Sequence, residues 1–255
     1  MSVVLYEKKD HIAHIRLNRP ESLNAVNREL AQELAKIWRD FKNDKDLWVG
    51  IVSGEGRSFC AGADVKELQP GNWEFSKSLI FGDDRLAPSN YDVWKPLIAA
   101  VHGHVYGAGF WIALECDIRI AANNARFGIP EGKIGLVTLF APFLANYLPR
   151  GVAADLLLSG DPIDAERAYQ LGLVSKVVPP EQLLSAATKM AEAVMSNSPL
   201  ATFGTKELMC RTQDMDRTSA IALIEQIATR IFNLKDTVEA RRAFIEKRKP
   251  EWKLR

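Results

Sequence analysis

Apolar and polar residues alternate in short blocks along the first two thirds of the chain. The β-rich runs at residues 3–7 and 11–17 flank a polar Lys-Lys-Asp turn and predict a hairpin. A helical pattern follows, for which Asn27 is a candidate N-cap. Its apolar positions, at helical spacing, are Leu30, Leu34, Ile37, Trp38 and Phe41.

The same order of elements then repeats. A short apolar strand, "LWVGIVSG", leads through a Gly-rich turn into "SFCAGADVKEL". After a polar, proline-containing stretch at residues 69–96, the strand "PLIAAVHG" leads through "YGAG" into a helix "FWIALE" and a strand "DIRIAA". Strands and helices alternate to about residue 178, so the pattern predicts an α/β core of repeated strand-strand-helix units.

Helical patterns alone follow Pro179. Pro180 lies near the first turn of one predicted helix, a Ser-Pro pair starts the next, and Asp236 is a candidate cap for the last. We therefore divide the chain into an α/β core, residues 1–190, and a C-terminal helical region, residues 191–255. That region either closes the same core or forms an oligomer contact.

Composition narrows the classes of function. The chain has 255 residues, 47% of them hydrophobic, and its 33 basic and 32 acidic side chains leave a formal charge of +1. We expect a folded soluble protein with no nucleic-acid or membrane partner, since neither its charge nor any long apolar run favours one. Cys60, Cys116 and Cys210 form no C-x-x-C pair, which is typical of free thiols in a reducing compartment, and we predict a cytoplasmic location.

Several catalytic signatures are absent from the sequence. There is no G-x-S-x-G elbow, no H-E-x-x-H pair and no Walker loop, and "GAGFWI" lacks the third small residue of a dinucleotide-binding turn. His102 and His104 have no partner at metal-ligand spacing, so we expect no metal site.

Two stretches share one design, "FCAGADVKEL" at residues 59–68 and "HVYGAGFWIAL" at residues 104–114. Each ends a strand, passes through glycine and alanine, and enters a predicted helix. Free N–H groups at a helix start would lie open to a ligand and could bind a carbonyl oxygen between them. The alternative is tight packing of strand against helix, which also requires small residues.

These turns resemble those of the crotonase, or enoyl-CoA hydratase/isomerase, superfamily. The resemblance extends over nearly the whole chain, through "IRLNRPESLNAVN", "CDIRIAANNARFGIPE", "GDPIDAERAYQLGLVSKVVP" and "AFIEKRK". It implies a crotonase-like spiral of repeated strand-strand-helix units with a helical C-terminal trimerisation region. It also implies a homotrimer or a dimer of trimers, an acyl-CoA substrate, and no cofactor beyond the coenzyme A moiety of that substrate.

The motif positions also imply the catalytic groups. The backbone N–H groups of Ala63 and Ala108 would form an oxyanion hole for the thioester oxygen. Glu131, within "FGIPEGKIG", would carry the α-proton, with its pKa raised by apolar surroundings. The alternative for Glu131 is an exposed glutamate in a Pro-Gly turn.

This sequence departs from the hydratase pattern at the other catalytic carboxylate, which falls at Trp111. The family's usual Pro and Gly-rich turn after the glutamate is here "GLVTLFAPFL", in which Leu139 and Phe140 replace groups that leave room for water and a flat acyl chain. These changes predict a drier pocket of altered shape. We therefore predict double-bond isomerisation of an acyl-CoA by a single glutamate through an oxyanion-stabilised enolate.

Two alternatives remain at this stage. One is a hydratase for a 2-enoyl-CoA or an unusual cyclic or dienoyl-CoA, with the water held by Glu131 itself or by another group, for which Glu115 and Asp64 are the candidate substitute bases. The other is a non-catalytic CoA-binding protein.

The resemblance also implies contacts to coenzyme A. Leu23 and Ala25 would lie near the pantetheine, and Ala61, Asp64 and Lys66 would lie around the adenine-ribose end. Phe244 and Lys247 match the family's C-terminal contacts to adenine and phosphate, which a neighbouring subunit often supplies. An aromatic ring suits a purine and an ammonium suits a phosphate.

Overall fold

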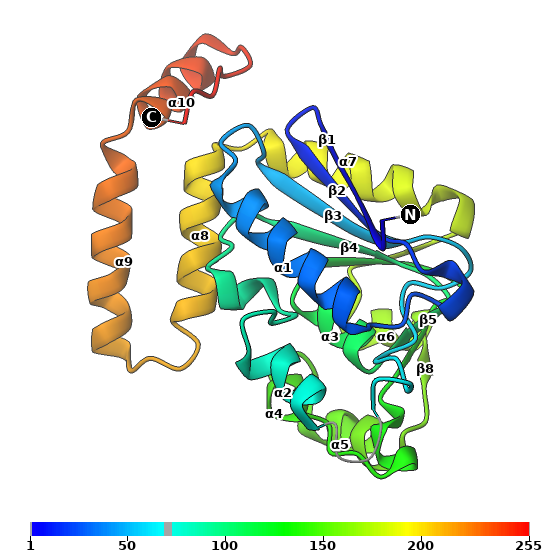
Figure 1. Cartoon of the computed structure of the whole chain (residues 1–255). Helices are drawn as coiled ribbons and strands as arrows, with labels where there is room; N and C mark the ends of the chain where they lie inside the picture. Colours follow the sequence, from blue (N-terminus) through cyan, green and yellow to red (C-terminus); the bar gives the residue numbers. More distant parts are fainter. Residues whose placement is uncertain (1, 69–72, 255) are drawn as a thin grey trace.

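Two β-sheets form the centre of the computed structural model, which describes residues 2–68 and 73–254 (Figure 1). The larger sheet has the order β1 (Val4–Lys9), β2 (Ile12–Leu17), β3 (Val49–Gly54), β4 (Leu97–Val101), β6 (Ile118–Ala122) and β9 (Lys176–Val178). The smaller has the order β5 (His104–Tyr106), β7 (Arg126–Gly128) and β8 (Ile163–Asp164). Among these neighbours, β1 with β2 and β7 with β8 are antiparallel, and the rest are parallel.

Helices surround both sheets. They are α1 (Arg28–Asn43), α2 (Trp73–Phe81), α3 (Ala108–Leu114), α4 (Ala141–Leu144), α5 (Arg150–Ser159), α6 (Ala165–Gln170), α7 (Leu183–Met195), α8 (Pro199–Arg211), α9 (Arg217–Phe232) and α10 (Lys235–Glu246). Short 3-10 turns are η1 (Pro20–Ser22), η2 (Pro88–Tyr91), η3 (Pro130–Ile134) and η4 (Pro180–Gln182). No helix in the described ranges is long and apolar enough to span a bilayer.

The chain passes alternately through the two sheets and so forms a spiral. After β4 in the larger sheet it enters β5 in the smaller one, and after β6 it enters β7. Cys60, which follows β3, makes a parallel bridge with Val105 of β5, so the preceding turn of the spiral stacks on the same side. The predicted fold of repeated strand-strand-helix units is therefore confirmed, and its stacking brings the two small-residue turns together.

The central strands β3 and β4 of the larger sheet are buried on both faces, which explains their nearly continuous apolar sequences. In β4, Leu97, Ala99 and Val101 belong to the main core, whereas Ile98 and Ala100 belong to a second cluster on the other face. Helix α7 covers this second face with Leu183, Ala186, Ala187 and Ala191.

Helix α1 confirms the sequence prediction. The side-chain oxygen of Asn27 accepts a hydrogen bond from the N–H of Leu30 at 2.9 Å, and all five predicted apolar side chains are buried. The cap satisfies one of the free N–H groups at the helix start, and the apolar stripe fixes the face that packs on the sheet.

The first hairpin turns later than predicted. Lys8 and Lys9 belong to β1, and the turn consists of Asp10 and His11, with φ of +49° and +65°. A two-residue turn with both φ positive matches the twist of the paired strands, so the strands extend further than the polar sequence indicated.

A second difference is α2, within the stretch at residues 69–96 for which no helix was predicted. Phe75 and Leu79 of this helix are buried in the main core. Residues 69–72 lie outside the described ranges.

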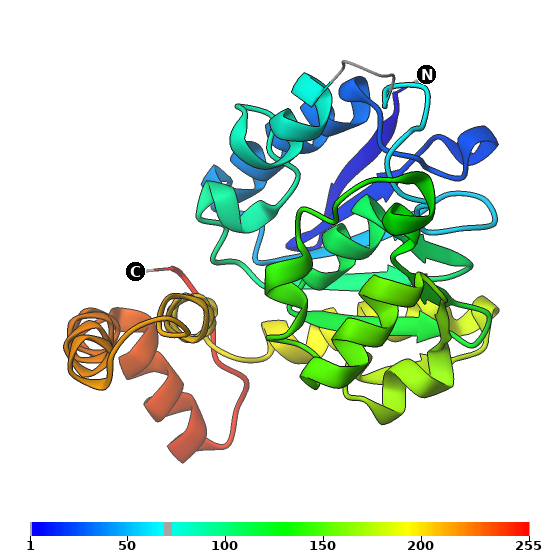
Figure 2. The ribbon, with the colours of Figure 1, turned by 90° about the horizontal axis from the view of Figure 1, so that it is seen from below.

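The C-terminal helices extend away from the sheets. Helix α8 stays attached through Lys206, whose Nζ contacts Asp117 Oδ2 at 2.8 Å and the carbonyl oxygen of Lys95 at 2.9 Å. Helices α9 and α10 stand apart from the body in both views (Figures 1 and 2). The division proposed after residue 190 lies inside α7, because Ala191 still packs on the sheet.

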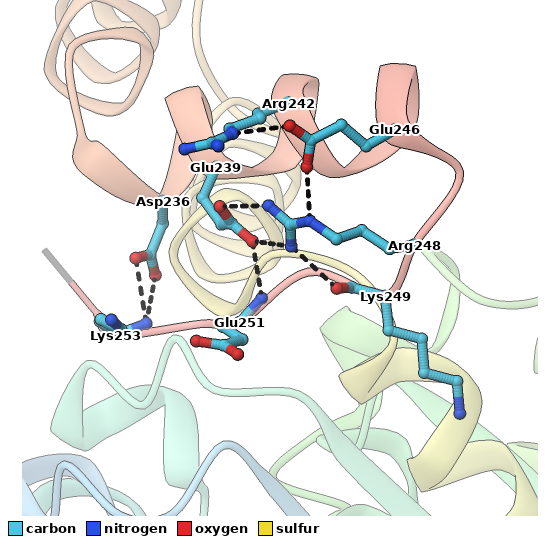
Figure 3. Close-up of polar contacts among 8 residues, drawn as sticks. All are labelled: Asp236, Glu239, Arg242, Glu246, Arg248, Lys249, Glu251 and Lys253. Carbon is cyan, nitrogen blue, oxygen red and sulfur yellow. Dashed lines mark hydrogen bonds and ion pairs between the residues drawn. The ribbon is translucent and has the colours of Figure 1, made fainter.

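Asp236 is not the cap of α10; Leu234 occupies that position, and Asp236 lies in the first turn. Its buried carboxylate accepts hydrogen bonds from the N–H groups of Lys253 and Leu254, because the chain folds back along α10 (Figure 3). Arg248 also holds the returning chain, with two guanidinium nitrogens bonded to the carboxylate of Glu239 at 2.6 and 3.0 Å.

Candidate active site

The segment from Phe59 to Asp64 is held between neighbouring turns of the spiral. The N–H of Cys60 donates to the carbonyl of His104 at 2.9 Å, and the carbonyl of Cys60 accepts from Tyr106 at 3.0 Å. On the other side, Val26 donates to the carbonyl of Gly62 and accepts from the N–H of Asp64, both at 2.8 Å. These bonds fix the backbone on either side of Ala63.

The prediction that both small-residue turns enter a helix is correct for one of them. Helix α3 begins at Ala108, directly after the second turn. Within residues 59–68 the first turn enters no helix, and parallel bridges to Val26 and Val105 hold it instead. The N–H of Ala63 is therefore oriented by strand-like pairing rather than by a helix start.

Ala63 and Ala108 line one cavity of about 270 Å³. Within the described part of the chain, neither backbone N–H donates to a protein carbonyl or side chain. Two free donors at one cavity can bind a single oxygen atom, as the sequence predicts for this pair.

Glu131 lines the same cavity from η3. Its Oε2 is buried and has no hydrogen-bond partner, and its Oε1 lies against Gly107. Burial raises the pKa of the Glu131 carboxyl above its ordinary value. The side chain is therefore not an exposed glutamate in a turn, and its free oxygen can take or give a proton at the cavity.

Each glycine of the second turn has its own reason to lack a side chain. Gly107 has a φ of +49°, and a Cβ there would lie 2.5 Å from Oε1 of Glu131. A Cβ on Gly109 would lie 2.5 Å from Cβ of Cys60. Gly107 thus leaves room for the Glu131 carboxylate, and Gly109 allows α3 to pack closely on the preceding turn of the spiral. Small residues are therefore required here both by the packing of the fold and by the candidate site.

The three predicted pocket residues, Trp111, Leu139 and Phe140, line the cavity together. The rings of Trp111 and Phe140 stack with centroids 5.8 Å apart and planes inclined by 19°. Helix α3 supplies one ring and the residue before α4 supplies the other.

Neither candidate substitute base belongs to the cavity lining. The Oε1 of Glu115 accepts a hydrogen bond from the indole N–H of Trp111 at 3.1 Å. Asp64 is paired with Arg19 at 3.0 Å and accepts the N–H of Lys66 at 3.1 Å. Among the described residues that line the cavity, Glu131 is the single carboxylate.

The predicted CoA contacts fall into two groups. Ala61 lines the cavity, its N–H donates to the carbonyl of Leu23 at 3.0 Å, and the neighbouring Ala25, Asp64 and Lys66 belong to the same paired segments. Phe244 and Lys247 lie in and directly after α10, outside the cavity lining, and Phe244 is 85% exposed. A single chain does not bring these two groups together.

The side chains that complete the cavity were not predicted from the sequence. They are Val65, Leu68, Leu79, Ile80, Pro130, Lys133, Ile134, Leu136 and Val137. Two come from α2, where Glu74, Ser78 and Lys77 interrupt any apolar run. Lys133 is the cation of the set, and its Nζ is paired with Asp161 at 2.6 Å.

Two further observations concern metals and thiols. Within the ranges the structure describes, no group of three His, Cys, Asp or Glu side chains could hold a metal ion. All three cysteines are free, and burial raises the pKa of Cys60 and of Cys116 to about 12, so these two thiols stay protonated and unreactive.

A largely buried carboxylate that shares an apolar cavity with two free backbone N–H groups has the parts needed for acid–base chemistry next to a carbonyl group. The family model described as enoyl-CoA hydratase/isomerase matches residues 7–255. The chain belongs to this family and is an enzyme of the hydratase/isomerase class.

Relatives and solved structures agree over nearly the whole length. The chain is 34% identical to the (E)-benzylidenesuccinyl-CoA hydratase of Thauera aromatica over 98% of both chains. It is 36% identical to the short-chain-enoyl-CoA hydratase of Clostridium acetobutylicum, over 97% of this chain and 96% of that one. The crystal structure of an enoyl-CoA hydratase/isomerase from Mycobacterium paratuberculosis superposes with a TM-score of 0.92 at 34% identity, covering 99% of each chain.

Proposed function

We propose that this enzyme transfers a proton at the α-carbon of an enoyl-CoA thioester and thereby moves a double bond. Glu131 is the acid and base, and the N–H groups of Ala63 and Ala108 bind the thioester oxygen. The proposal rests on one observation about Glu131. Its Oε2 is buried without a hydrogen-bond partner, and Glu131 is the single carboxylate among the described residues that line the cavity.

The reaction balances with one carboxylate. Glu131 removes a proton from the α-carbon of a 3-enoyl-CoA, and the negative charge that develops on the thioester oxygen is stabilised by the two N–H groups. The same carboxyl then returns the proton to the γ-carbon, giving the 2-enoyl-CoA. Glu131 carries the proton between the two carbons and can exchange it with solvent before returning it, so no water adds to the substrate and no redox cofactor takes part.

Hydration is the second candidate, and the relatives favour it, since those named above include two hydratases. Water would add to the β-carbon while Glu131 delivers the α-proton. Trp111 stands where the sequence pattern places the second hydratase carboxylate, and an indole cannot take a proton from water. Glu131 would therefore have to activate the water as well.

The two candidates are separated by following both reactions in D₂O. We expect deuterium to enter the α-position of a 3-enoyl-CoA, and we expect slow or absent hydration of crotonyl-CoA. Glu131→Gln should abolish the exchange. Efficient hydration of crotonyl-CoA by the unmodified enzyme would favour the second candidate. Binding without any exchange would contradict both and revive a non-catalytic CoA-binding role.

We further propose that the substrate's coenzyme A is bound between subunits of a homotrimer or a dimer of trimers. Leu23, Ala25, Ala61 and the paired Asp64 lie beside the cavity, whereas Lys247 follows the projecting α10. Arg242 and Arg248 are paired with Glu246. Within the described residues Lys247 has no such acidic partner, which leaves its ammonium available for a phosphate.

No cofactor beyond coenzyme A, no metal, no nucleic acid and no membrane is required by this proposal. A cytoplasmic location accords with it, because Cys60 and Cys116 are buried free thiols and the net charge of +1 attracts neither nucleic acid nor anionic lipid.

A further inference from the structure

Trp111 is held in one orientation by its own helix. It lies one turn after Ala108 in α3, is 6% exposed, and lines the cavity. Its indole N–H donates to Oε1 of Glu115, which is one turn further along and is not part of the cavity lining. Because the polar atom of the ring is already bonded outside the cavity, Trp111 offers a ligand an apolar surface.

Phe140 extends this surface. It is 3% exposed and comes from the loop before α4, and its ring lies nearly parallel to the indole of Trp111. Two nearly parallel rings supplied by separate elements form an aromatic wall, and close packing restricts the rotation of both rings.

The rest of the cavity is almost entirely aliphatic. Leu79 and Ile80 of α2 and Leu136 and Val137 of the loop after η3 are among its side chains. Its two charged side chains within the described residues are Glu131, which the proposed reaction uses, and Lys133, which is half exposed and paired with Asp161 at 2.6 Å. A polar or charged acyl group that packs on the apolar lining around Trp111 would therefore lose its water without gaining a partner there.

We propose that the acyl group bound here is uncharged and carries an aromatic ring, which packs on the wall formed by Trp111 and Phe140. Glu115 is a positioning residue that acts through the indole N–H. The proposal rests on the proposed function in taking an acyl-CoA as the ligand, and it adds the class of acyl group.

The test compares unreactive ligands, so that it does not depend on catalysis. Calorimetry would measure the Kd of 4-phenylbutanoyl-CoA and 4-cyclohexylbutanoyl-CoA, which have the same carbon skeleton and differ in planarity and aromaticity. Hydrophobic transfer alone gives the cyclohexyl ligand no disadvantage, whereas stacking adds up to about tenfold. We expect the phenyl ligand to bind at least fivefold more tightly, and a ring carboxylate to weaken binding at least tenfold.

Variants assign the preference to its residues. Phe140→Leu should reduce the phenyl/cyclohexyl ratio toward one, and Phe143→Leu, in the same segment but exposed and outside the cavity, should keep it. Glu115→Ala should reduce the ratio, whereas Glu115→Gln should restore it, since the amide oxygen still accepts the indole N–H.

The outcomes separate the two proposals. Equal affinities, or tighter binding of the cyclohexyl ligand, would overturn the aromatic proposal even if the enzyme exchanges α-protons normally. A phenyl preference that depends on Phe140, in an enzyme that exchanges no α-proton, would support the aromatic wall and overturn the proposed function.

Discussion

The burial that suits Glu131 for the proposed proton transfer also lowers the stability of the folded state when the carboxyl is charged. Its Oε2 is buried without a partner, and burial raises the pKa of its carboxyl. Between the ordinary glutamate pKa and the raised one, the folded state binds more protons than the unfolded state. The free energy of unfolding therefore falls as pH rises through this range and stays lowered above it.

Replacing this carboxyl by an amide should separate the two effects. We expect Glu131→Gln to lower turnover at least ~100-fold, because the proton carrier is lost. At pH 8 the variant should also be more stable by roughly 1 kcal/mol, because no charge is buried without a partner. Urea unfolding at pH 8 and pH 5 measures this, with the exposed Glu192→Gln as control. A variant less stable than wild type at pH 8 would contradict the argument.

Gly107 leaves the space that the Glu131 carboxylate occupies. In Gly107→Ala the new methyl group would lie 2.5 Å from Oε1 of Glu131, and alanine would have to adopt a φ of +49°. Because Glu131 would have to move, we expect turnover to fall at least ~10-fold. Gly132→Ala is the matched control, because nothing lies within 4 Å of its Cβ position. Steady-state kinetics on one acyl-CoA compares them, and equal rates would show that the close approach does not matter.

At the scale of an element, helix α3 connects the proposed oxyanion hole to the core. Its first residue, Ala108, lines the cavity, and the carbonyls of Ala113 and Leu114 at its other end accept hydrogen bonds from the half-buried Arg119. Arg119 also donates to the carbonyl of Leu173, so both the helix end and the following strands are fixed. The position of the Ala108 N–H thus depends on contacts at the opposite end of a short helix.

Ala108→Pro tests the donor without breaking the helix. Proline is tolerated at the first helical position, where its missing N–H has no partner within the helix. We expect turnover to fall ~100-fold or more, with a smaller change in CoA affinity. Ala108→Gly retains the N–H and serves as control, and circular dichroism reports on the fold. Wild-type turnover in the proline variant would remove Ala108 from the mechanism.

At the scale of the whole molecule, the C-terminal helices expose an apolar surface. Several large apolar side chains of α9 and α10 are exposed in the single chain: Ile221, Ile224, Phe232, Val238, Phe244 and Ile245. Such side chains are typical of an interface between subunits.

We therefore expect analytical ultracentrifugation to give a trimer or a hexamer. Lys247→Glu should leave the assembly intact and raise the Kd for acyl-CoA, because it reverses the charge that we propose binds a phosphate. Lys189→Glu makes the same change at an exposed position of α7 and should leave the Kd unchanged. A monomer at micromolar concentration would exclude a CoA contact supplied by a neighbour.

Local signals in the sequence were sufficient for much of the fold. The 3.6-residue spacing and the Asn27 cap of α1, the apolar strands, and the change to helices after Pro179 all depend on neighbours within a few residues. The family motifs singled out Glu131, Ala63, Ala108 and Trp111, which the structure places at one cavity.

Only the tertiary structure decided how these residues meet. The pairing of Cys60 with Val105 orients Ala63 without a helix. Position 109 must be glycine because a Cβ there would lie 2.5 Å from Cβ of Cys60, which is far away in the sequence. Asp236 looked like a cap because Asp favours helix starts, yet it bonds a returning segment 17 residues later. The sequence records which residues are apolar, small or charged, whereas their contacts depend on which strands pair and stack, a choice set by the packing of the whole chain.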